Sequence, residues 1–236
     1  MSQIKFTDLI LYEDDNLVVV DKPANISTLD DRNDPINMLK LAHNYLDDLQ
    51  ICHRLDKETS GALVIAKNPD SYRHMALQFE QRKVKKIYHA VVEGNHDFIE
   101  MEVNEPILIA NRGRVKIHGM GKPSITRVKT ITQFKRYTLV ECQPLTGRMH
   151  QIRIHLSHLQ APISGDNKYG GSSLYLSSIK RNYQLKKYQT EIPLIKRMAL
   201  HAAKIKFQSL DDQLLEVEAP YPKDFKVLLK QLDLNR

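Results

Sequence analysis

The sequence lacks most features that mark secreted, membrane or disulfide-rich proteins. Among its 236 residues there are two cysteines, Cys52 and Cys142, which lie far apart and do not have the CxxC spacing of zinc and redox motifs. No apolar stretch approaches the ~20 residues that a membrane-spanning helix requires. The first residues lack the basic and apolar regions of a signal peptide. We therefore expect a cytoplasmic protein with no membrane partner, no disulfide and no cysteine-bound zinc.

Sequence motifs for nucleotide cofactors and metals are also missing. Neither a P-loop nor a dinucleotide-binding glycine pattern occurs. The histidines His150, His155 and His158 lie close together, but their spacing does not match the HExxH pattern of a zinc helix. No carboxylate is suitably placed beside them. The sequence thus predicts a protein without a cofactor or a metal, in which these histidines belong to the surface or the core.

Positive charge is in excess. The formal net charge is +7 and the sequence pI is about 9.2, which favours a polyanionic partner such as nucleic acid. The segment 172–198 is particularly basic and has one acidic residue, Glu191. Its composition suits an RNA backbone with unstacked bases, and it suits a plain solvated basic segment equally well. Its basic and aromatic residues are Lys180, Arg181, Lys186, Lys187, Lys196, Arg197, Tyr175, Tyr183 and Tyr188.

The hydrophobic pattern predicts more strands than helices. Hydrophobic residues make up 42% of the chain, enough for a substantial core. Most predicted connections are hairpins, which favours an α+β fold around a largely antiparallel sheet in a single domain, 1–236. The first helix is predicted to begin with Asp34 as its N-cap. The predicted hairpins are 9–20 and 204–218; the other strands are 62–66, 87–93 and 137–142; the helices are 34–46, 69–79, 150–160 and 225–232.

One dense polar run occupies residues 53–61, which read His-Arg-Leu-Asp-Lys-Glu-Thr-Ser-Gly. The Thr-Ser-Gly end predicts a turn, and the apolar run 62–66 that follows predicts a buried strand. Arg54 and Asp56 would then lie in an irregular loop supported by a core, as many catalytic residues do. A solvated turn aspartate, or an ion pair between Arg54 and Asp56, would explain the spacing equally well.

A second polar run occupies residues 145–156, where a strand passes through a glycine turn into a helix. The run contains Arg148, His150, Gln151 and Arg153. Helix N-termini attract anions, and two arginines strengthen this effect. The arginines could bind phosphates, or one of them could pair with a carboxylate elsewhere in the chain. A polar, glycine-rich loop follows at 165–171.

Together the two runs resemble the signature blocks of the RluA-type pseudouridine synthases. The first matches His-Arg-Leu-Asp-x-x-Thr-Ser-Gly, and the second matches Thr-Gly-Arg-x-His-Gln-Ile-Arg-x-His. Several independent blocks in the right order extend the resemblance from about residue 10 to residue 225, nearly the whole chain. These further blocks are 12–24, 85–90, 121–126, 165–170 and 201–203.

The resemblance implies an isomerase that converts specific uridines of a structured RNA to pseudouridine, without cofactor or metal. The base is cut from C1′, turned over and rejoined through C5. By motif, Asp56 would be the catalytic aspartate, Arg153 would pair with it, and Tyr88 would lie against the target base. Arg54 would help to replace the flipped nucleotide. The other residues expected to bind the substrate are Lys86, Arg148, His150 and Gln151. The implied fold is a mixed, mainly antiparallel sheet with flanking helices and a central RNA-binding cleft.

These residue types suit that chemistry. A carboxylate can act as a nucleophile or remove a sugar proton, and an arginine partner keeps it ionised and oriented. A stacked uridine must be extruded to reach a buried aspartate. A planar cation such as that of Arg54 can stack in the place that the base leaves. An aromatic ring such as that of Tyr88 confines the detached base and permits it to turn.

The sequence departs from the family pattern in two places: the first leaves the role of the loop 25–34 open, and the second bears on target choice. Many relatives continue after Lys-Pro-Ala with Gly and a Val-His-Pro-like segment, whereas the loop 25–34 begins Asn-Ile-Ser-Thr-Leu. Some relatives carry an N-terminal S4-type domain, which we expect to be missing here. Target choice would then depend on the cleft and on local inserts, among which we place 172–198. By analogy we expect a monomer that acts on large-subunit rRNA or, second, on tRNA; the alternative is a catalytically silent RNA-binding or RNA-chaperone homologue.

Overall fold

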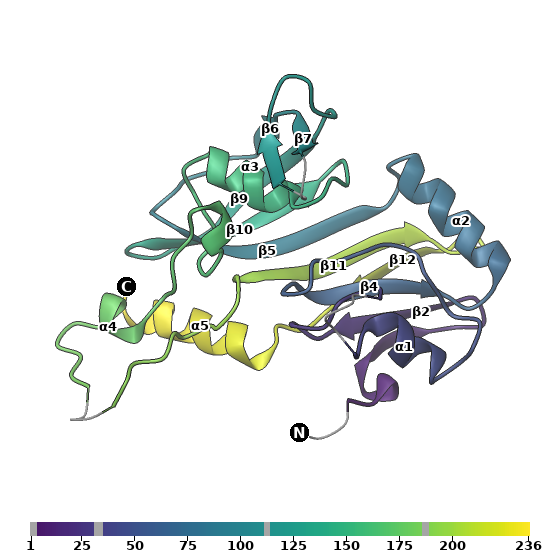
Figure 1. Cartoon of the computed structure of the whole chain (residues 1–236), viewed down its shortest axis with the longest axis horizontal. Coiled ribbons are helices and arrows are strands. Elements are labelled where there is room, and N and C mark those ends of the chain that lie inside the picture. Colours follow the sequence, from purple (N-terminus) through teal and green to yellow (C-terminus); the bar gives the residue numbers. More distant parts are fainter. Residues whose placement is uncertain (1–3, 31–34, 111–113, 186–188) are drawn as a thin grey trace. The chain divides into compact units, whose positions relative to one another are not determined.

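The computed structural model describes residues 4–30, 35–110, 114–185 and 189–236 (Figure 1). By internal packing the chain divides into two compact units. Unit 1 comprises Met1–Ile87 and His201–Pro220, and unit 2 comprises Tyr88–Leu200 and Tyr221–Arg236. Within the described ranges, no helix is long and apolar enough to cross a lipid bilayer.

Unit 1 is built on strands in the order β1-β2-β4-β11, with β12 beside β11 and β3 beside β4 (Figure 1). The neighbouring strands are antiparallel, except that β4 and β11 are parallel. Every residue of β4 is buried, as its apolar sequence predicts. The elements of unit 1 are η1 (Phe6–Leu9), β1 (Ile10–Glu13), β2 (Leu17–Lys22), α1 (Met38–His43), β3 (Gln50–Ile51), β4 (Ser60–Ala66), α2 (Pro69–Glu80), β11 (Leu200–Gln208) and β12 (Leu214–Glu218).

The hairpins predicted from the sequence are confirmed in unit 1, as β1–β2 and β11–β12. The helix predicted to open at Pro69 is confirmed as α2. Its N-cap is Asn68, whose side chain accepts a hydrogen bond from the Ser71 N–H, and Pro69 occupies the first turn. Met75 of this helix is fully buried.

The prediction for the first helix was wrong at both ends. Helix α1 begins at Met38, because the Asn37 side chain accepts a hydrogen bond from the Lys40 N–H and so acts as the N-cap. Asp34, the predicted N-cap, lies outside the described residues. The helix ends at His43, and Leu46, which the periodicity placed on its apolar face, is 44% exposed.

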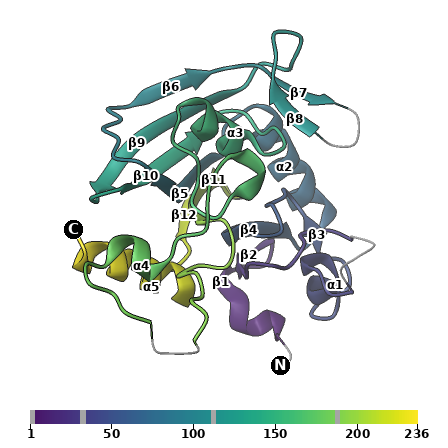
Figure 2. The same cartoon turned by 60° about the vertical axis from the view of Figure 1, so that its left-hand side comes forward.

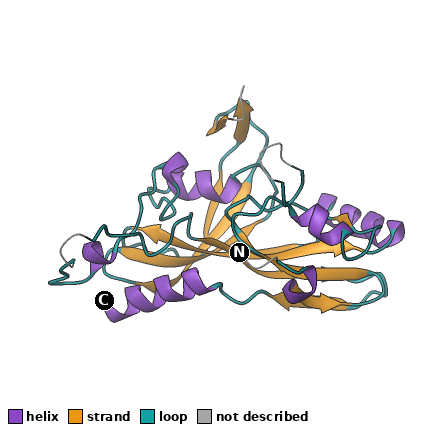
Figure 3. Ribbon diagram, turned by 60° about the horizontal axis from the view of Figure 1, so that its bottom comes forward, coloured by secondary structure: helices purple, strands orange, loops and turns teal. Residues whose placement is uncertain are grey.

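Unit 2 contains an antiparallel sheet in the order β5-β10-β9-β6 and a separate hairpin, β7–β8 (Figure 2). Helices α3 and α5 lie on opposite faces of its strands (Figure 3). The strands and helices predicted over 87–93, 137–142, 150–160 and 225–232 are confirmed as β5, β10, α3 and α5. The elements are β5 (Lys85–Glu93), β6 (Met101–Asn104), β7 (Ile107–Ala110), β8 (Arg114–Ile117), β9 (Ile125–Gln133), β10 (Tyr137–Pro144), α3 (Gln151–His158), η3 (Asn167–Tyr169), α4 (Leu176–Ile179) and α5 (Lys223–Leu234).

The expected class, an α+β fold with mixed and mainly antiparallel strands, is confirmed. One member of the basic segment 172–198 needs correction. Arg197 is 3% exposed, and its guanidinium forms a bidentate pair with Asp224 and donates to the carbonyls of Met198 and Leu200. Arg197 therefore stabilises the interior of unit 2 and does not add to a basic surface. Lys186, Lys187 and Tyr188 lie outside the described residues.

Candidate active site

The Asp56 loop, residues 53–59, connects β3 to β4 in unit 1 and has no regular secondary structure. Arg54 is exposed and Asp56 is half-buried. The Thr59 N–H donates to the Asp56 carbonyl at 3.0 Å, which closes a turn directly after the aspartate. The predicted arrangement, an irregular loop followed by a buried strand, is confirmed.

Thr28 fixes the residue before Asp56. Its hydroxyl donates to the Leu55 carbonyl at 2.8 Å and accepts from the Leu55 N–H at 3.1 Å. Thr28 is 3% exposed and Leu55 is 7% exposed, so water does not compete freely for these bonds. One side chain thus satisfies both backbone groups of the residue that precedes the aspartate.

Lys22 fixes the residue after Asp56. This lysine is fully buried at the end of β2, and its ammonium group donates to three backbone carbonyls. Two of the carbonyls, of Pro23 and Ile26, are each at 2.8 Å, and the third, of Lys57, is at 3.1 Å. The Asn25 N–H also donates to the Lys57 carbonyl, at 2.9 Å. The loop after β2 therefore supports the Asp56 loop from both sides of the aspartate, a role that the sequence left open for residues 25–34.

His53 anchors the start of the loop as a neutral side chain. Its Nε2 atom accepts a hydrogen bond from the Val64 N–H of β4 at 3.1 Å, and its ring packs on Phe79 with centroids 5.0 Å apart. Burial, and secondarily the positive charge of Lys86, lower the pKa of His53 to about 3. Lys86 is half-buried with its ammonium 5.9 Å from the Phe79 ring centre, and burial lowers its pKa as well. Its expected contact with RNA stays a prediction.

The Thr-Ser-Gly end of the motif is needed for close packing. Gly61 has φ +115°, and a Cβ atom there would lie 2.2 Å from the Ala202 carbonyl oxygen of β11. The Ser60 hydroxyl and His201 Nδ1 share a hydrogen bond of 2.9 Å, and His201 Nε2 donates to the Ala219 carbonyl at 3.1 Å. The parallel contact between β4 and β11 thus requires glycine at this position.

Unit 2 carries the second group of site residues, which we call the arginine cluster: Arg148, His150, Arg153, Asp166 and Tyr169. The Arg153 guanidinium forms a bidentate pair with Asp166, with Nε–Oδ2 at 2.7 Å and Nη2–Oδ1 at 2.8 Å. The side chain of Asp166 is 2% exposed and that of Arg153 is 11% exposed. The Arg153 Cζ atom also lies 4.9 Å from the centre of the Tyr169 ring. These contacts hold the guanidinium in one orientation.

Tyr169 also contacts His150 in the arginine cluster. His150 precedes α3 in a left-handed conformation, with φ +55°. Its Nδ1 atom and the Tyr169 hydroxyl share a hydrogen bond of 2.7 Å, and the two rings meet edge to face. Backbone strain at a non-glycine residue is sustained where surrounding contacts determine the conformation, often at functional sites.

Gln151 supports the cluster from within. It is 4% exposed, and its amide oxygen accepts from the Thr146 hydroxyl at 2.7 Å and from the Arg148 N–H at 3.0 Å. Its amide nitrogen donates to the Ile125 carbonyl and to the Thr126 hydroxyl, each at 2.9 Å. We expected Gln151 to bind the substrate, but these four bonds engage its amide inside the protein. Its contribution to the site is to hold the loop that carries Arg148.

Arg148 has an unusual environment for a charged side chain. Its Nε atom is buried, and within the described part of the chain no atom accepts a hydrogen bond from it. A buried donor without a partner is costly, so such groups commonly mark a ligand site. Arg148 therefore fits the predicted role of an anion-binding residue.

Tyr88 lies on β5 in unit 2, opposite Cys142 of β10, and packs half-buried against the core of this unit. The expected pair between Asp56 and Arg153 joins residues of different units, and it stays a prediction.

The sequence did not assign roles to four residues that support the site: Asp166, Tyr169, Lys22 and Thr28. The signal for the first two was the block 165–170, which matched the family but contained no obvious catalytic residue. Among the described residues, no group of three or more histidines, cysteines and carboxylates could hold a metal ion.

Comparison with known proteins decides the family. The family model "RNA pseudouridylate synthase" matches residues 16–158. The chain belongs to the RNA pseudouridylate synthase family. The RluA-type resemblance is thereby confirmed, and the protein is an RNA pseudouridine synthase, an isomerase that acts on uridines of RNA.

The names of individual relatives support the same family assignment. Ribosomal large subunit pseudouridine synthase C of Vibrio vulnificus is 34% identical over 234 residues, which cover 97% of this chain and 70% of that protein. Ribosomal large subunit pseudouridine synthase D of Buchnera aphidicola is 33% identical over 233 residues, covering 94% and 73%. Among solved structures, human RNA Pseudouridylate Synthase Domain Containing 4 has a TM-score of 0.73 at 25% identity, covering 97% and 94%.

Proposed function

We propose that this RNA pseudouridine synthase modifies large-subunit ribosomal RNA and that Asp56 is its catalytic carboxylate. The target rests on relatives whose names state that they act on the large ribosomal subunit. The catalytic role rests chiefly on one observation, the support of Asp56 by Thr28 on one side and by Lys22 on the other. A solvated turn aspartate needs no such support, whereas a catalytic group must be held within a fraction of an ångström.

The remaining site residues follow from the same proposal. Arg153, held by Asp166, would orient and keep ionised the carboxylate of Asp56. Tyr88 would confine the detached base while it turns, and Arg54, which is exposed, would occupy the place of the extruded nucleotide. Arg148, which is half-buried and whose Nε atom has no partner in the described part of the chain, would bind a phosphate of the RNA. We place this reaction in the cytoplasm, where ribosomal RNA is available to a monomeric enzyme.

The test replaces Asp56 by Asn and maps pseudouridines in total RNA from cells that lack the gene, express the wild type or express the variant. We expect specific large-subunit rRNA positions to lose pseudouridine without the gene, to regain it with the wild type and to stay unmodified with Asp56→Asn. Binding of the purified variant to rRNA should remain near wild type. Asp48→Asn, at an exposed position of unit 1, removes the same charge and should restore modification.

Three results would count against the proposal. Modification by Asp56→Asn or Asp56→Ala at the wild-type rate would remove Asp56 from the mechanism. Loss of pseudouridine from tRNA, with rRNA unchanged, would assign a different target. If the wild-type protein binds RNA but modifies no position, it is an RNA-binding homologue without catalytic activity.

A further inference from the structure

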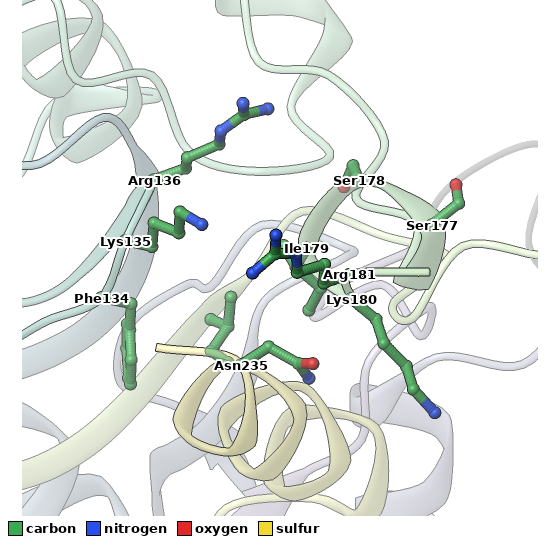
Figure 4. A pocket seen from close by; sticks show the side chains of 10 residues that line it. Phe134, Lys135, Arg136, Ser177, Ser178, Ile179, Lys180, Arg181 and Asn235 are labelled. Atoms are coloured by element: carbon green, nitrogen blue, oxygen red, sulfur yellow. The ribbon is translucent and has the colours of Figure 1, made fainter. Parts of the chain in front are cut away.

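Unit 2 contains a cavity of about 420 Å³ that the proposed reaction does not use. It lies between the turn that joins β9 to β10, helix α4 with the residues that follow it, and the end of α5 (Figure 4). We call it the basic pocket, and the residues that matter for its chemistry are Lys135, Arg136, Ser177, Lys180 and Arg181.

The lining of the basic pocket carries four cations and no acidic residue. In Figure 4, the Arg181 guanidinium and the Lys135 ammonium group approach the cavity from opposite walls, and Lys180 extends away from it. Within the described ranges, none of these cations forms a salt bridge with a carboxylate. The adjacent carboxylate of Glu191 accepts a hydrogen bond from the Ser177 N–H at 2.8 Å. The pocket therefore concentrates positive charge that the protein does not neutralise.

These groups fit a phosphate. Arginine presents planar pairs of N–H donors that match phosphate oxygens, and lysine and serine add single donors. A base-recognition function is disfavoured, because Phe134, the aromatic side chain of the lining, is 6% exposed and lies under Arg236, with Cζ 5.3 Å from the ring centre. The pocket thus suits a ligand that is recognised by its phosphate and not by its base.

The position of the pocket within unit 2 connects it to the site. On the β5–β10 pair, Tyr88 lies opposite Cys142 and Glu93 lies opposite Tyr137, which directly follows Arg136. Glu93 lies five positions after Tyr88, which amounts to about 17 Å along the strand at ~3.3 Å per residue. An RNA strand whose target base contacts Tyr88 would need several further nucleotides to reach the pocket.

We infer that the basic pocket binds a backbone phosphate of the RNA substrate several nucleotides away from the target uridine. The inference rests on the proposed function, because it takes the RNA substrate as the ligand. It also gives the basic segment 172–198 a specific partner: Arg181, from this segment, acts together with Lys135, which comes from outside it. Such a contact adds affinity and register without reading sequence.

The experiment compares the double variant Lys135→Gln/Arg181→Gln with Lys223→Gln/Lys226→Gln, a control that removes the same charge from exposed positions of α5 in the same unit. Affinity for an rRNA fragment is measured over a range of salt concentrations. For the pocket variant we expect weaker binding and a slope of log K against log salt reduced by about 1, because one phosphate contact is lost. For the control variant we expect the wild-type slope. On an RNA shortened to the hairpin around the target uridine, both variants should bind like the wild type.

Unchanged affinity and slope of the pocket variant on the long RNA would overturn the inference. So would an equal loss in the control variant, which would indicate a general charge effect. The wild type is also titrated with inorganic phosphate; saturable binding that the pocket variant loses, with RNA binding unchanged, would show that the pocket serves a free phosphate compound. The RNA-binding readout does not depend on turnover, so a wild-type protein that makes no pseudouridine would refute the proposed function and leave the test of the pocket readable.

Discussion

Replacement of Thr28 by Val should destabilise the protein and slow the reaction more than the small chemical change suggests. Valine has nearly the same shape as threonine, so the substitution removes the hydroxyl and little else. The N–H and the carbonyl of Leu55 would both lose their partner at a position that is 7% exposed. Each buried backbone group without a partner costs about 1–3 kcal/mol, and we expect a total loss of about 2–6 kcal/mol in the free energy of unfolding.

The catalytic effect should exceed the effect on RNA binding. Leu55 precedes Asp56 directly, and a displacement of about 1 Å at a catalytic group can cost on the order of 10²-fold in rate. We therefore expect single-turnover pseudouridine formation by Thr28→Val to slow by about 10- to 100-fold. Its Kd for rRNA should stay close to the wild-type value, because Thr28 is buried.

Thr28→Ser is the matched control, since it keeps the hydroxyl and removes a methyl group. We expect this variant to lose about 1 kcal/mol and to keep its rate within a few fold. Urea denaturation gives the stabilities, and quenched single-turnover reactions on an rRNA fragment give the rates. If Thr28→Val is as stable as Thr28→Ser and reacts as fast, the two hydrogen bonds do not hold the Asp56 loop, and the argument from its support fails.

Three further predictions concern unit 1. Lys22→Met removes a fully buried ammonium group that donates to three backbone carbonyls, so we expect a loss of about 3 kcal/mol in the free energy of unfolding and slower pseudouridine formation. His53→Gln should make the free energy of unfolding less dependent on pH. The pKa of His53 is about 3 in the folded state and about 6.5 in the unfolded state, so between pH 3 and pH 6.5 only the unfolded state binds a proton at this histidine. Wild-type stability should therefore fall by about 1.4 kcal/mol per pH unit well below 6.5, and at pH 5 urea denaturation should show about 2 kcal/mol of this loss that the variant lacks. Gly61→Ala should cost more than about 3 kcal/mol, because its Cβ would lie 2.2 Å from a carbonyl oxygen of β11 at a positive φ.

Each of these has a comparison within the chain. Lys67 donates to Glu13 and to the Asp14 carbonyl away from the Asp56 loop, so Lys67→Met should leave the rate unchanged. A rate as low as that of Lys22→Met would indicate a general effect of lysine removal. For His53→Gln, a pH profile of stability parallel to the wild type would contradict the neutral histidine. Gly119 has open space around it, and Gly119→Ala should be close to neutral.

The elements that the sequence predicted well are those with strong local signals. Strand β4 is a continuous apolar run, and α2 begins with Asn68 and Pro69, so neither depends on distant residues. Strand β9 gave no such signal, because its core-facing residues include Thr126, which is fully buried, while Ile131 is 44% exposed. Thr126 is buried because it bonds with Gln151 and His155, and these contacts exist only after folding.

The same distinction applies to the site. Asp56 could be singled out as a candidate because the motif around it is contiguous. Lys22 could not, since a lysine before a proline at a strand end normally lies in solvent. Its burial becomes favourable only where three carbonyls from two loops meet around its ammonium group. The positions that support a proposed catalytic residue are therefore harder to find from sequence than the residue itself.

Arg153 shows how a family motif and a structure supply different parts of one argument. The motif suggests a carboxylate partner for this arginine in Asp56, and the structure gives it another partner in Asp166. The two are compatible, because a guanidinium carries five N–H donors and the pair with Asp166 uses Nε and one N–H of Nη2. A long, flexible side chain that must meet a catalytic carboxylate loses less conformational freedom if a second carboxylate already orients it. Asp166, with its side chain 2% exposed, is suited to that task, since it holds the guanidinium through two hydrogen bonds that are shielded from water.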